Sequence, residues 1–168
     1  MNQDREIVLI AHNLRSCHNV GSLLRTAEGL GISEVFLTGY TPYPKQVKDD
    51  RLPYLAAKTD KQIHKTALGA EQSVKWQHKD DILSLISELA KAGYEVCALE
   101  QARDSIKLPD YKAPAKVALI IGREVEGVES EVLAKVHKIL EIPMFGQKES
   151  FNVTQAAAMA LYHIKFGE

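Results

Sequence analysis

Cysteine is scarce in this chain: it has two, Cys17 and Cys97, far apart and without metal-ligand spacing. Two such cysteines support neither a disulfide scaffold nor a structural zinc site. Long apolar runs are missing too, since stretches such as Val117 to Ile121 fall far short of a membrane span. The N-terminus, MNQDREIVLI, lacks the basic and long apolar regions of a secretory signal. These absences predict a soluble, cytoplasmic protein that does not enter a membrane.

Linkers are absent as well. The chain has 168 residues, 45% of them hydrophobic, and no Gly/Ser-rich or Pro-rich stretch divides it. A chain of this size suits one compact domain with a sizeable core. We therefore expect a single domain over residues 1–168.

Short apolar runs alternate with amphipathic stretches, which is typical of an α/β domain with a mainly parallel sheet flanked by helices. The predicted strands are Ile7–Ile10, Val35–Leu37, Tyr94–Leu99, Val117–Ile121 and Ile139–Ile142. The predicted helices are Val20–Leu30, Asp80–Ala92, Ser130–His137 and Val153–Phe166. Asn19 is the expected N-cap of the first helix, Ser130 that of the third, and Gly31 the residue that ends the first.

The segment between Gly39 and Lys79 shows no clear periodicity, which in a compact domain is typical of a functional or disordered stretch. Lys45 to Lys79 contains eight Lys/Arg and four Asp/Glu, although the whole chain carries a net charge of −1. This local excess of positive charge fits a phosphate-facing patch. It fits an ordinary solvated surface loop equally well.

A first motif runs from Asn19 to Gly31, NVGSLLRTAEGLG. Helical periodicity places Gly21, Ser22, Arg25 and Gly29 on the face away from the apolar stripe. Glycine inside a helix costs about 0.5–1 kcal/mol relative to alanine, so its presence suggests close approach by another backbone or a ligand. Arg25 is then a phosphate or ribose contact, or simply a surface arginine paired with Glu28.

Two further motifs follow later in the chain. In the second, LIIGREVEGVESEVL from Leu119, a buried strand runs into Gly122, Glu124 and Gly127. Ligands of open α/β sheets bind beyond the carboxyl ends of strands, so this loop is a candidate ligand site. An ordinary strand-to-helix turn would also explain Gly122. In the third, IPMFGQKESFNVT from Ile142 to Thr154, Ser150 and Asn152 precede a helix, where residues of this kind ordinarily act as caps.

The three motifs in this order resemble those of the SpoU/TrmH family of RNA ribose methyltransferases, within the SPOUT superfamily. That pattern runs N-x-G-x-x-x-R, then G-x-E-x-x-G, then IPM-x-G-x-x-x-S-x-N-V-[ST]. The matching residues are Asn19, Gly21, Arg25, Gly122, Glu124, Gly127, Ile142, Pro143, Met144, Gly146, Ser150, Asn152 and Val153. Phe151, where the family more often has Leu, and Thr154, where Ser is common, are mild departures. The resemblance spans nearly the whole chain, from about Ile7 to Phe166.

The resemblance implies a SPOUT fold, in which the C-terminal segment forms a deep trefoil knot, a rare exception to ordinary chain connectivity. It also implies that S-adenosylmethionine binds against this knot, mostly through backbone groups, without a metal. Carried over by position, the cofactor-binding residues are Leu99, Gly122, Ile142, Met144, Phe151 and Asn152.

The implied reaction is methyl transfer from S-adenosylmethionine to a ribose 2′-hydroxyl of RNA. The resemblance gives Arg25 the central catalytic role, with Asn19, Glu124, Ser150 and Asn152 positioning it, the ribose and the cofactor. An arginine stays protonated, so anchoring a phosphate and stabilising a developing alkoxide suit Arg25 better than acting as a literal base.

The resemblance further implies a homodimer and an RNA substrate, with tRNA favoured over rRNA because the chain is a minimal core. Lys61, His64 and Lys65, in the basic stretch, are the candidate RNA contacts besides Arg25. One alternative is a non-catalytic RNA-binding protein with the same fold, which would be expected to lose Arg25, Asn152 or the glycines. Another is a doubly wound nucleotide-binding enzyme, but His12 to Asn19 contains no glycine for a phosphate loop.

Overall fold

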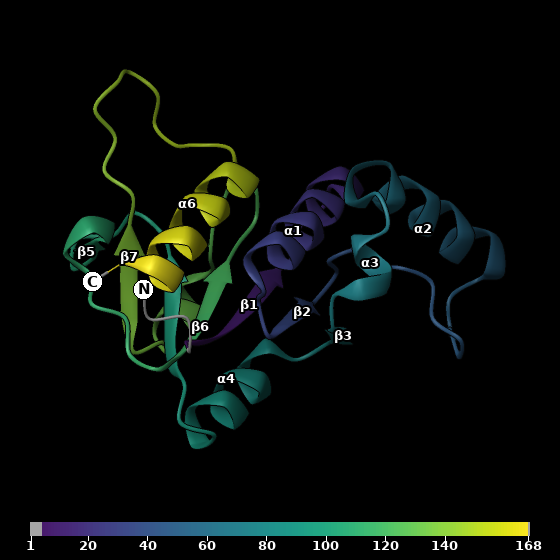
Figure 1. Cartoon of the computed structure of the whole chain (residues 1–168), viewed down its shortest axis with the longest axis horizontal. Helices are drawn as coiled ribbons and strands as arrows, with labels where there is room; N and C mark the ends of the chain where they lie inside the picture. The colour runs from purple at the N-terminus through teal and green to yellow at the C-terminus, as the bar shows by residue number, and fades with distance from the viewer. Residues whose placement is uncertain (1–4, 168) are drawn as a thin grey trace.

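The computed structural model describes residues 5–167, and a seven-stranded parallel sheet lies at its centre (Figure 1). The strands, in chain order, are β1 (Glu6–His12), β2 (Glu34–Thr38), β3 (Trp76–Lys79), β4 (Glu95–Leu99), β5 (Ile106–Lys107), β6 (Lys116–Ile121) and β7 (Lys138–Glu141). Their order across the sheet is β3-β2-β1-β6-β4-β7-β5. Because these pairings are parallel, the carboxyl ends of the strands share one edge of the sheet.

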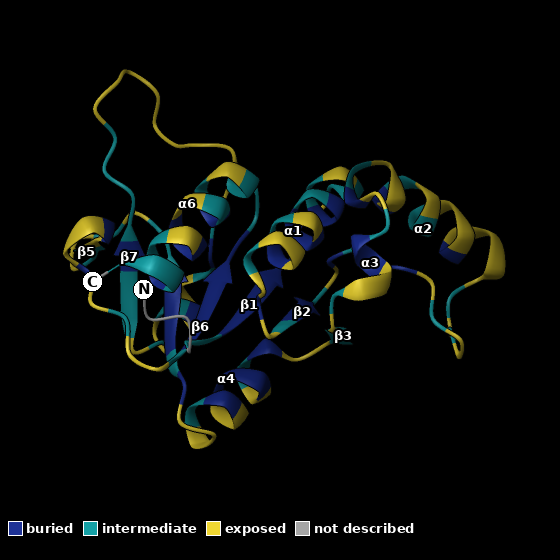
Figure 2. Cartoon of the chain, viewed as in Figure 1, coloured by how far each residue is buried: buried dark blue, intermediate teal, exposed yellow. Residues whose placement is uncertain are grey.

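Helices cover both faces of the sheet. They are α1 (Cys17–Leu30), α2 (Pro53–Ala67), α3 (Ala70–Ser73), α4 (Ile82–Lys91), α5 (Ser130–Leu133) and α6 (Val153–Phe166), with a 3-10 turn η1 (Leu108–Asp110). Ile7 and Leu9 of β1 face α1 and α6, whereas Val8 and Ile10 face α4 and α5. This alternation makes a three-layer domain, and Figure 2 shows buried strands beneath helices with exposed outer sides.

The predicted α/β class, with a parallel sheet flanked by helices, is confirmed. The C-terminal knot stays a prediction of the resemblance. The helix ends differ in detail, because Ser16 rather than Asn19 caps α1, its hydroxyl accepting from the Asn19 N–H at 3.1 Å. Likewise, Ser130 is the first residue of α5 rather than its cap, and α5 ends at Leu133. No helix among residues 5–167 is long and apolar enough to cross a membrane.

The segment from Gly39 to Lys79 is more ordered than its sequence predicts, because it contains α2, α3 and β3. The helical pattern of α2 is weak, since Ile63 is its one large buried side chain and its other buried positions are Ala56 and Ala67. A helix that packs through alanines gives little apolar periodicity, and α2 was therefore not predicted from the sequence. Pro53 at its first turn is the sequence signal that was available.

Small side chains bring α1 and α2 close together. Gly21 is buried, and a Cβ built on it would lie 2.2 Å from the Ile63 carbonyl oxygen and 2.2 Å from the Thr66 hydroxyl. The Thr66 hydroxyl also donates to the His18 carbonyl at 2.7 Å. The expected close approach of another backbone is therefore present at Gly21. Its placement on the outward face was wrong, and only Gly29 of the two glycines is exposed.

Replacing Gly21 with alanine should lower the free energy of unfolding by about 1–3 kcal/mol, because the new methyl group would push α2 away from α1. Gly29→Ala is the matched control in the same helix, since a Cβ there meets nothing within 4 Å. It should raise stability by about 0.5–1 kcal/mol. Urea denaturation of the two variants measures both effects, and equal stabilities would contradict this account of the helix pair.

Candidate functional site

A cavity of about 260 Å³ opens at the carboxyl ends of the neighbouring strands β6, β4 and β7, beside the start of α6. Its lining comes from the ends of these strands, the loop after β6 and the segment before α6. The lining residues are Leu99, Glu100, Gln101, Ile121, Gly122, Arg123, Glu124, Val125, Gly127, Ile142, Met144, Glu149, Ser150, Phe151, Val153 and Ala156. The fold thus brings together segments between Leu99 and Ala156, which lie nearly sixty residues apart in the chain.

Five of the six predicted cofactor residues line this cavity: Leu99, Gly122, Ile142, Met144 and Phe151. The sixth, Asn152, is the N-cap of α6, and its Oδ1 accepts from the Thr154 N–H at 2.9 Å and the Thr154 hydroxyl at 2.6 Å. Of the predicted catalytic residues, Glu124 and Ser150 also line the cavity.

The loop after β6 folds back on itself tightly enough to require glycine. A Cβ on Gly122 would lie 2.5 Å from the Gly127 carbonyl carbon, and one on Gly127 would lie 2.0 Å from Glu100 Oε2. Glu100 holds the far side of this loop, because its Oε2 accepts from the Val128 N–H at 2.9 Å. The two glycines of the second motif therefore stand where no side chain fits. Gly122 lies against the backbone of Gly127, and Gly127 lies against the Glu100 carboxylate.

Glu124 ties this loop to the start of α1. Its Oε1 accepts from the backbone N–H groups of Arg15 and Ser16, each at 3.2 Å, and from the Asn19 side-chain amide at 3.3 Å. The second motif is thereby hydrogen-bonded to the first. Burial tends to raise the pKa of Glu124, but hydrogen bonds from its own N–H, Ser16 and Asn19 outweigh it and hold the pKa below its ordinary value. The carboxylate is therefore charged at neutral pH, and its Oε1 accepts all three of these hydrogen bonds.

Arg25 does not line the cavity, although Asn19 of the same motif contacts the cavity residue Glu124. Its side chain is exposed on α1, and it has no hydrogen bond or ion pair within residues 5–167. The alternative pairing with Glu28 is not present there. The guanidinium is consequently free to take a ligand from outside this part of the chain.

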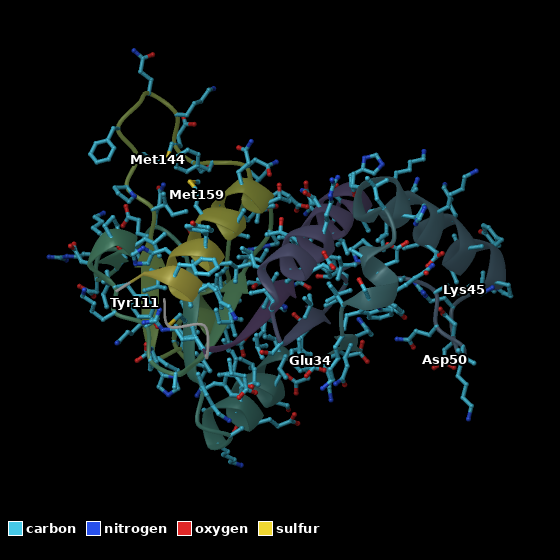
Figure 3. The ribbon with its side chains drawn as sticks, viewed as in Figure 1. Glu34, Lys45, Asp50, Tyr111, Met144 and Met159 are labelled. Atoms are coloured by element: carbon cyan, nitrogen blue, oxygen red, sulfur yellow. The ribbon has the colours of Figure 1, made fainter. Side chains whose placement is uncertain are left out.

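The basic stretch forms an arm at the far end of the molecule from the cavity segment 143–151. Figure 3 shows Lys45 and Asp50 at one end of the domain and Met144 at the other. We call residues 45–79 the basic arm. Of the candidate RNA contacts there, Lys61 and Lys65 are exposed on α2, whereas the His64 ring is hydrogen-bonded to the Glu71 carboxylate.

Internal pairing leaves the basic arm positively charged. Asp49 is held by Arg51 with an Nη2–Oδ2 distance of 2.6 Å, and Glu71 by His64. Five exposed lysines have no side-chain partner within residues 5–167, namely Lys45, Lys48, Lys58, Lys61 and Lys65. The arm therefore presents cations to solvent, and most of its acids are already occupied.

Sequence reasoning missed several cavity residues, chiefly Glu100, Arg123 and Glu149. Glu100 follows a buried strand directly, which was the signal that a parallel sheet offers. Arg123 lies between Gly122 and Glu124 of the second motif, and its Nε donates to the Gly127 carbonyl at 3.2 Å. Among residues 5–167 no group of three or more His, Cys, Asp or Glu side chains is placed to hold a metal ion.

A parallel α/β sheet with a cavity at the carboxyl ends of its strands defines the class of open-sheet domains that bind a ligand at this edge. Within this class the chain belongs to the SpoU rRNA methylase family, whose sequence profile matches residues 6–162.

Individual relatives agree with this assignment. The chain is 29% identical to a TrmH-family protein of Staphylococcus haemolyticus, over 94% of this chain and 57% of that protein. It is 23% identical to the tRNA (guanosine(18)-2′-O)-methyltransferase of Aquifex aeolicus, over 95% of this chain and 69% of that one. The chain thus spans a little over half the length of the first of these relatives.

The fold is shared with solved structures. An rRNA methyltransferase of Sinorhizobium meliloti, determined with bound S-adenosylmethionine, superposes with a TM-score of 0.78 at 21% identity. The match covers 97% of this chain and 57% of that one. At this identity the likeness establishes the fold.

Glu124→Gln should destabilise the protein by about 1 kcal/mol at pH 7, because the amide accepts weaker hydrogen bonds than the carboxylate. The pKa of Glu124 is lower in the folded state than its ordinary value of 4.5, so its contribution is present above pH 4.5. That contribution is lost as the pH falls through the folded-state pKa.

Denaturant unfolding at pH 7 and at successively lower pH tests this assignment. The difference between wild type and Glu124→Gln should shrink below pH 4.5. Glu126→Gln is the control, because that side chain is exposed and its nearest cation, Arg15 Nη2, lies 3.4 Å away. A pH-independent loss in Glu124→Gln would show that packing, rather than charge, accounts for the effect.

Proposed function

We propose that this protein transfers a methyl group from S-adenosylmethionine to a ribose 2′-hydroxyl of RNA. The observation that carries the proposal is the cavity at the ends of β6, β4 and β7, which collects residues of the second and third family motifs. The family assignment over residues 6–162 and the named activity of the Aquifex relative support the reaction class. The S-adenosylmethionine bound to the Sinorhizobium neighbour supports the cofactor.

The lining of the cavity fits such a cofactor. Leu99, Ile142 and Phe151 supply apolar surface for a purine ring. Three carboxylates, Glu100, Glu124 and Glu149, line the cavity against the single cation of Arg123. An acidic lining suits a ligand that carries a positive sulfonium. When bound there, the cofactor supplies the electrophilic methyl group, and the residues that would hold it are these side chains and the backbone near Gly122 and Met144.

The protein must also deal with the proton of the 2′-hydroxyl. Glu124 is a poor general base, because its carboxylate is occupied by three hydrogen bonds and its pKa is lowered mainly by them against the effect of burial. Glu124 and Asn19 instead position α1, and Ser150 and Asn152 position the segment before α6. Arg25 anchors an RNA phosphate and stabilises the developing alkoxide.

RNA binding rests on charge and exposure. Three exposed lysines of the basic arm, Lys58, Lys61 and Lys65, and the exposed guanidinium of Arg25 lie on the packed pair α1 and α2. Phosphate contacts of this kind position RNA without reading its sequence. We propose tRNA rather than rRNA as the substrate, on the named activity of the Aquifex relative.

We further propose that two copies of the chain associate through the exposed side of α6. Met159 and Tyr162 are 38% and 61% exposed there, and the Tyr162 ring lies 4.8 Å from that of Phe166. Ala158, Met159, Tyr162 and Phe166 border a shallow apolar hollow.

The direct test is transfer of a labelled methyl group from S-adenosylmethionine to unmodified tRNA and rRNA pools, followed by nucleoside mapping. We expect label on a 2′-O-methylated nucleoside of the tRNA pool. No incorporation into either pool would overturn the proposed activity. A non-catalytic RNA-binding protein with this fold would bind the RNA and transfer nothing.

Arg25→Ala should abolish methyl transfer and leave cofactor affinity within about twofold, because Arg25 lies outside the cavity. Isothermal titration with S-adenosylmethionine gives the affinity, and single-turnover assays give the rate. Lys91→Ala, an exposed cation of α4, is the control for general charge loss. Transfer at the wild-type rate by Arg25→Ala would remove Arg25 from the mechanism.

Tyr162→Glu should shift a dimer toward monomer, because it places a charge in the apolar surface of α6. Sedimentation velocity measures the change, and Gln155→Glu, at an exposed position of the same helix outside the hollow, is the matched control. An unchanged sedimentation coefficient in Tyr162→Glu would exclude this face as the interface.

A further inference from the structure

Two exposed side chains outside all three motifs meet beside the cavity. Arg15 lies between β1 and α1, and Tyr40 lies just after the neighbouring strand β2, so both residues stand at the same edge of the sheet. The Arg15 guanidinium and the Tyr40 hydroxyl lie close enough to interact electrostatically. The Arg15 side chain is 68% exposed, and Tyr40 is 54% exposed. Neither side chain packs in the hydrophobic core, and both are therefore accessible to a ligand.

Arg15 is joined directly to the cavity wall. Its backbone N–H donates to Glu124 Oε1 at 3.2 Å, and Glu124 lines the cavity. Its guanidinium reaches Glu126 of the same loop, with an Nη2–Oε1 distance of 3.4 Å. Both members of this ion pair are exposed, so the contact contributes little and is easily exchanged for another anion.

The backbone of Tyr40 is fixed by a partly buried hydrogen-bond network. The Tyr40 N–H donates to Asn13 Oδ1 at 3.1 Å, and Asn13 adopts a left-handed conformation with φ of 55° to make this contact. The Asn13 amide donates in turn to Glu129 Oε1 at 2.9 Å. Buried His12 lies against the same carboxylate, with Nε2 3.2 Å from Glu129 Oε2. Tyr40 is therefore held in place relative to the loop, residues 122–129, that forms one wall of the cavity.

The chemistry of the pair matches a nucleotide. A guanidinium binds a phosphate through two parallel hydrogen bonds, and a tyrosine ring stacks on an unpaired base. A carboxylate of a protein partner would form an ion pair with Arg15, but it would not stack on the Tyr40 ring. A ring whose backbone is already fixed loses little conformational freedom when a base stacks on it.

We propose that Arg15 and Tyr40 form an RNA subsite for a nucleotide next to the one whose ribose is methylated. Arg15 exchanges Glu126 for the phosphate of that nucleotide, and the ring of Tyr40 stacks on its base. The inference rests on the proposed RNA methyl transfer and adds residues that hold the substrate close to the cavity.

Binding of RNA tests the subsite independently of turnover. We would measure the affinity of pooled, in vitro transcribed tRNA by fluorescence anisotropy over a range of salt concentrations. Arg15→Ala should weaken binding by roughly tenfold and reduce the salt slope by about one. Tyr40→Leu should weaken binding by a similar factor with an unchanged salt slope, because stacking carries no charge. Tyr40→Phe keeps the ring and should bind nearly as the wild type does.

Three readouts separate a subsite from a general loss of structure. The Tm and the affinity for S-adenosylmethionine should stay at wild-type values in all three variants. The KM for RNA should rise in Arg15→Ala and Tyr40→Leu, while kcat changes little. Arg15→Lys should recover the salt slope but only part of the affinity, because an ammonium lacks the planar fork. Lys91→Ala on the opposite face of the sheet is the charge control.

The outcomes distinguish this inference from the proposed function. Wild-type affinity and salt slope in both Arg15→Ala and Tyr40→Leu, together with active methyl transfer, would overturn the subsite alone. Binding of the RNA pool by neither wild type nor variants would overturn the subsite and the proposed function together. Equal weakening by Arg15→Ala and Lys91→Ala would show that only net charge matters, which also contradicts the subsite.

Discussion

The carboxylate of Glu124 is the contact on which the arrangement of this site depends. It accepts hydrogen bonds from Arg15, Ser16 and Asn19 at the start of α1, where a helix has unpaired N–H groups and the positive end of its dipole. One charge therefore joins the loop after β6 to the loop after β1. This connection ties the wall of the cavity to the backbone of Arg15, so a change at Glu124 reaches a segment more than a hundred residues away in the chain.

Opposite charges are separated in space although the chain as a whole carries a net charge of −1. Carboxylates gather around the cavity, and exposed lysines gather on the basic arm. Ligands of opposite charge are thereby favoured at two different places on the molecule. The arm holds this position because Gly21 lets α2 lie directly on α1, so a packing constraint in the interior sets the electrostatics of the surface.

Much of the scaffold could be predicted because burial and periodicity coincide in it. The strand Val117 to Ile121 is apolar throughout because helices cover it on both sides, and α4 shows a clear stripe of buried leucine and isoleucine. The predictions failed where packing relies on small residues: α2 buries Ala56 and Ala67 and leaves no such stripe. Gly21 was assigned to the wrong face for the same reason, since a glycine carries no side chain to mark its orientation.

The sequence by itself determined the α/β class and the residues of the three motifs, because these depend on local residue types and on spacing along the chain. Only the tertiary structure decided that Glu124 binds the first turn of α1, that Glu100 supports the glycine loop, and that Arg25 lies outside the cavity. It also placed Tyr40 beside Arg15. The physical reason is that these contacts form between strand ends, and strand order in a parallel sheet is set by burial of the whole core rather than by any one segment.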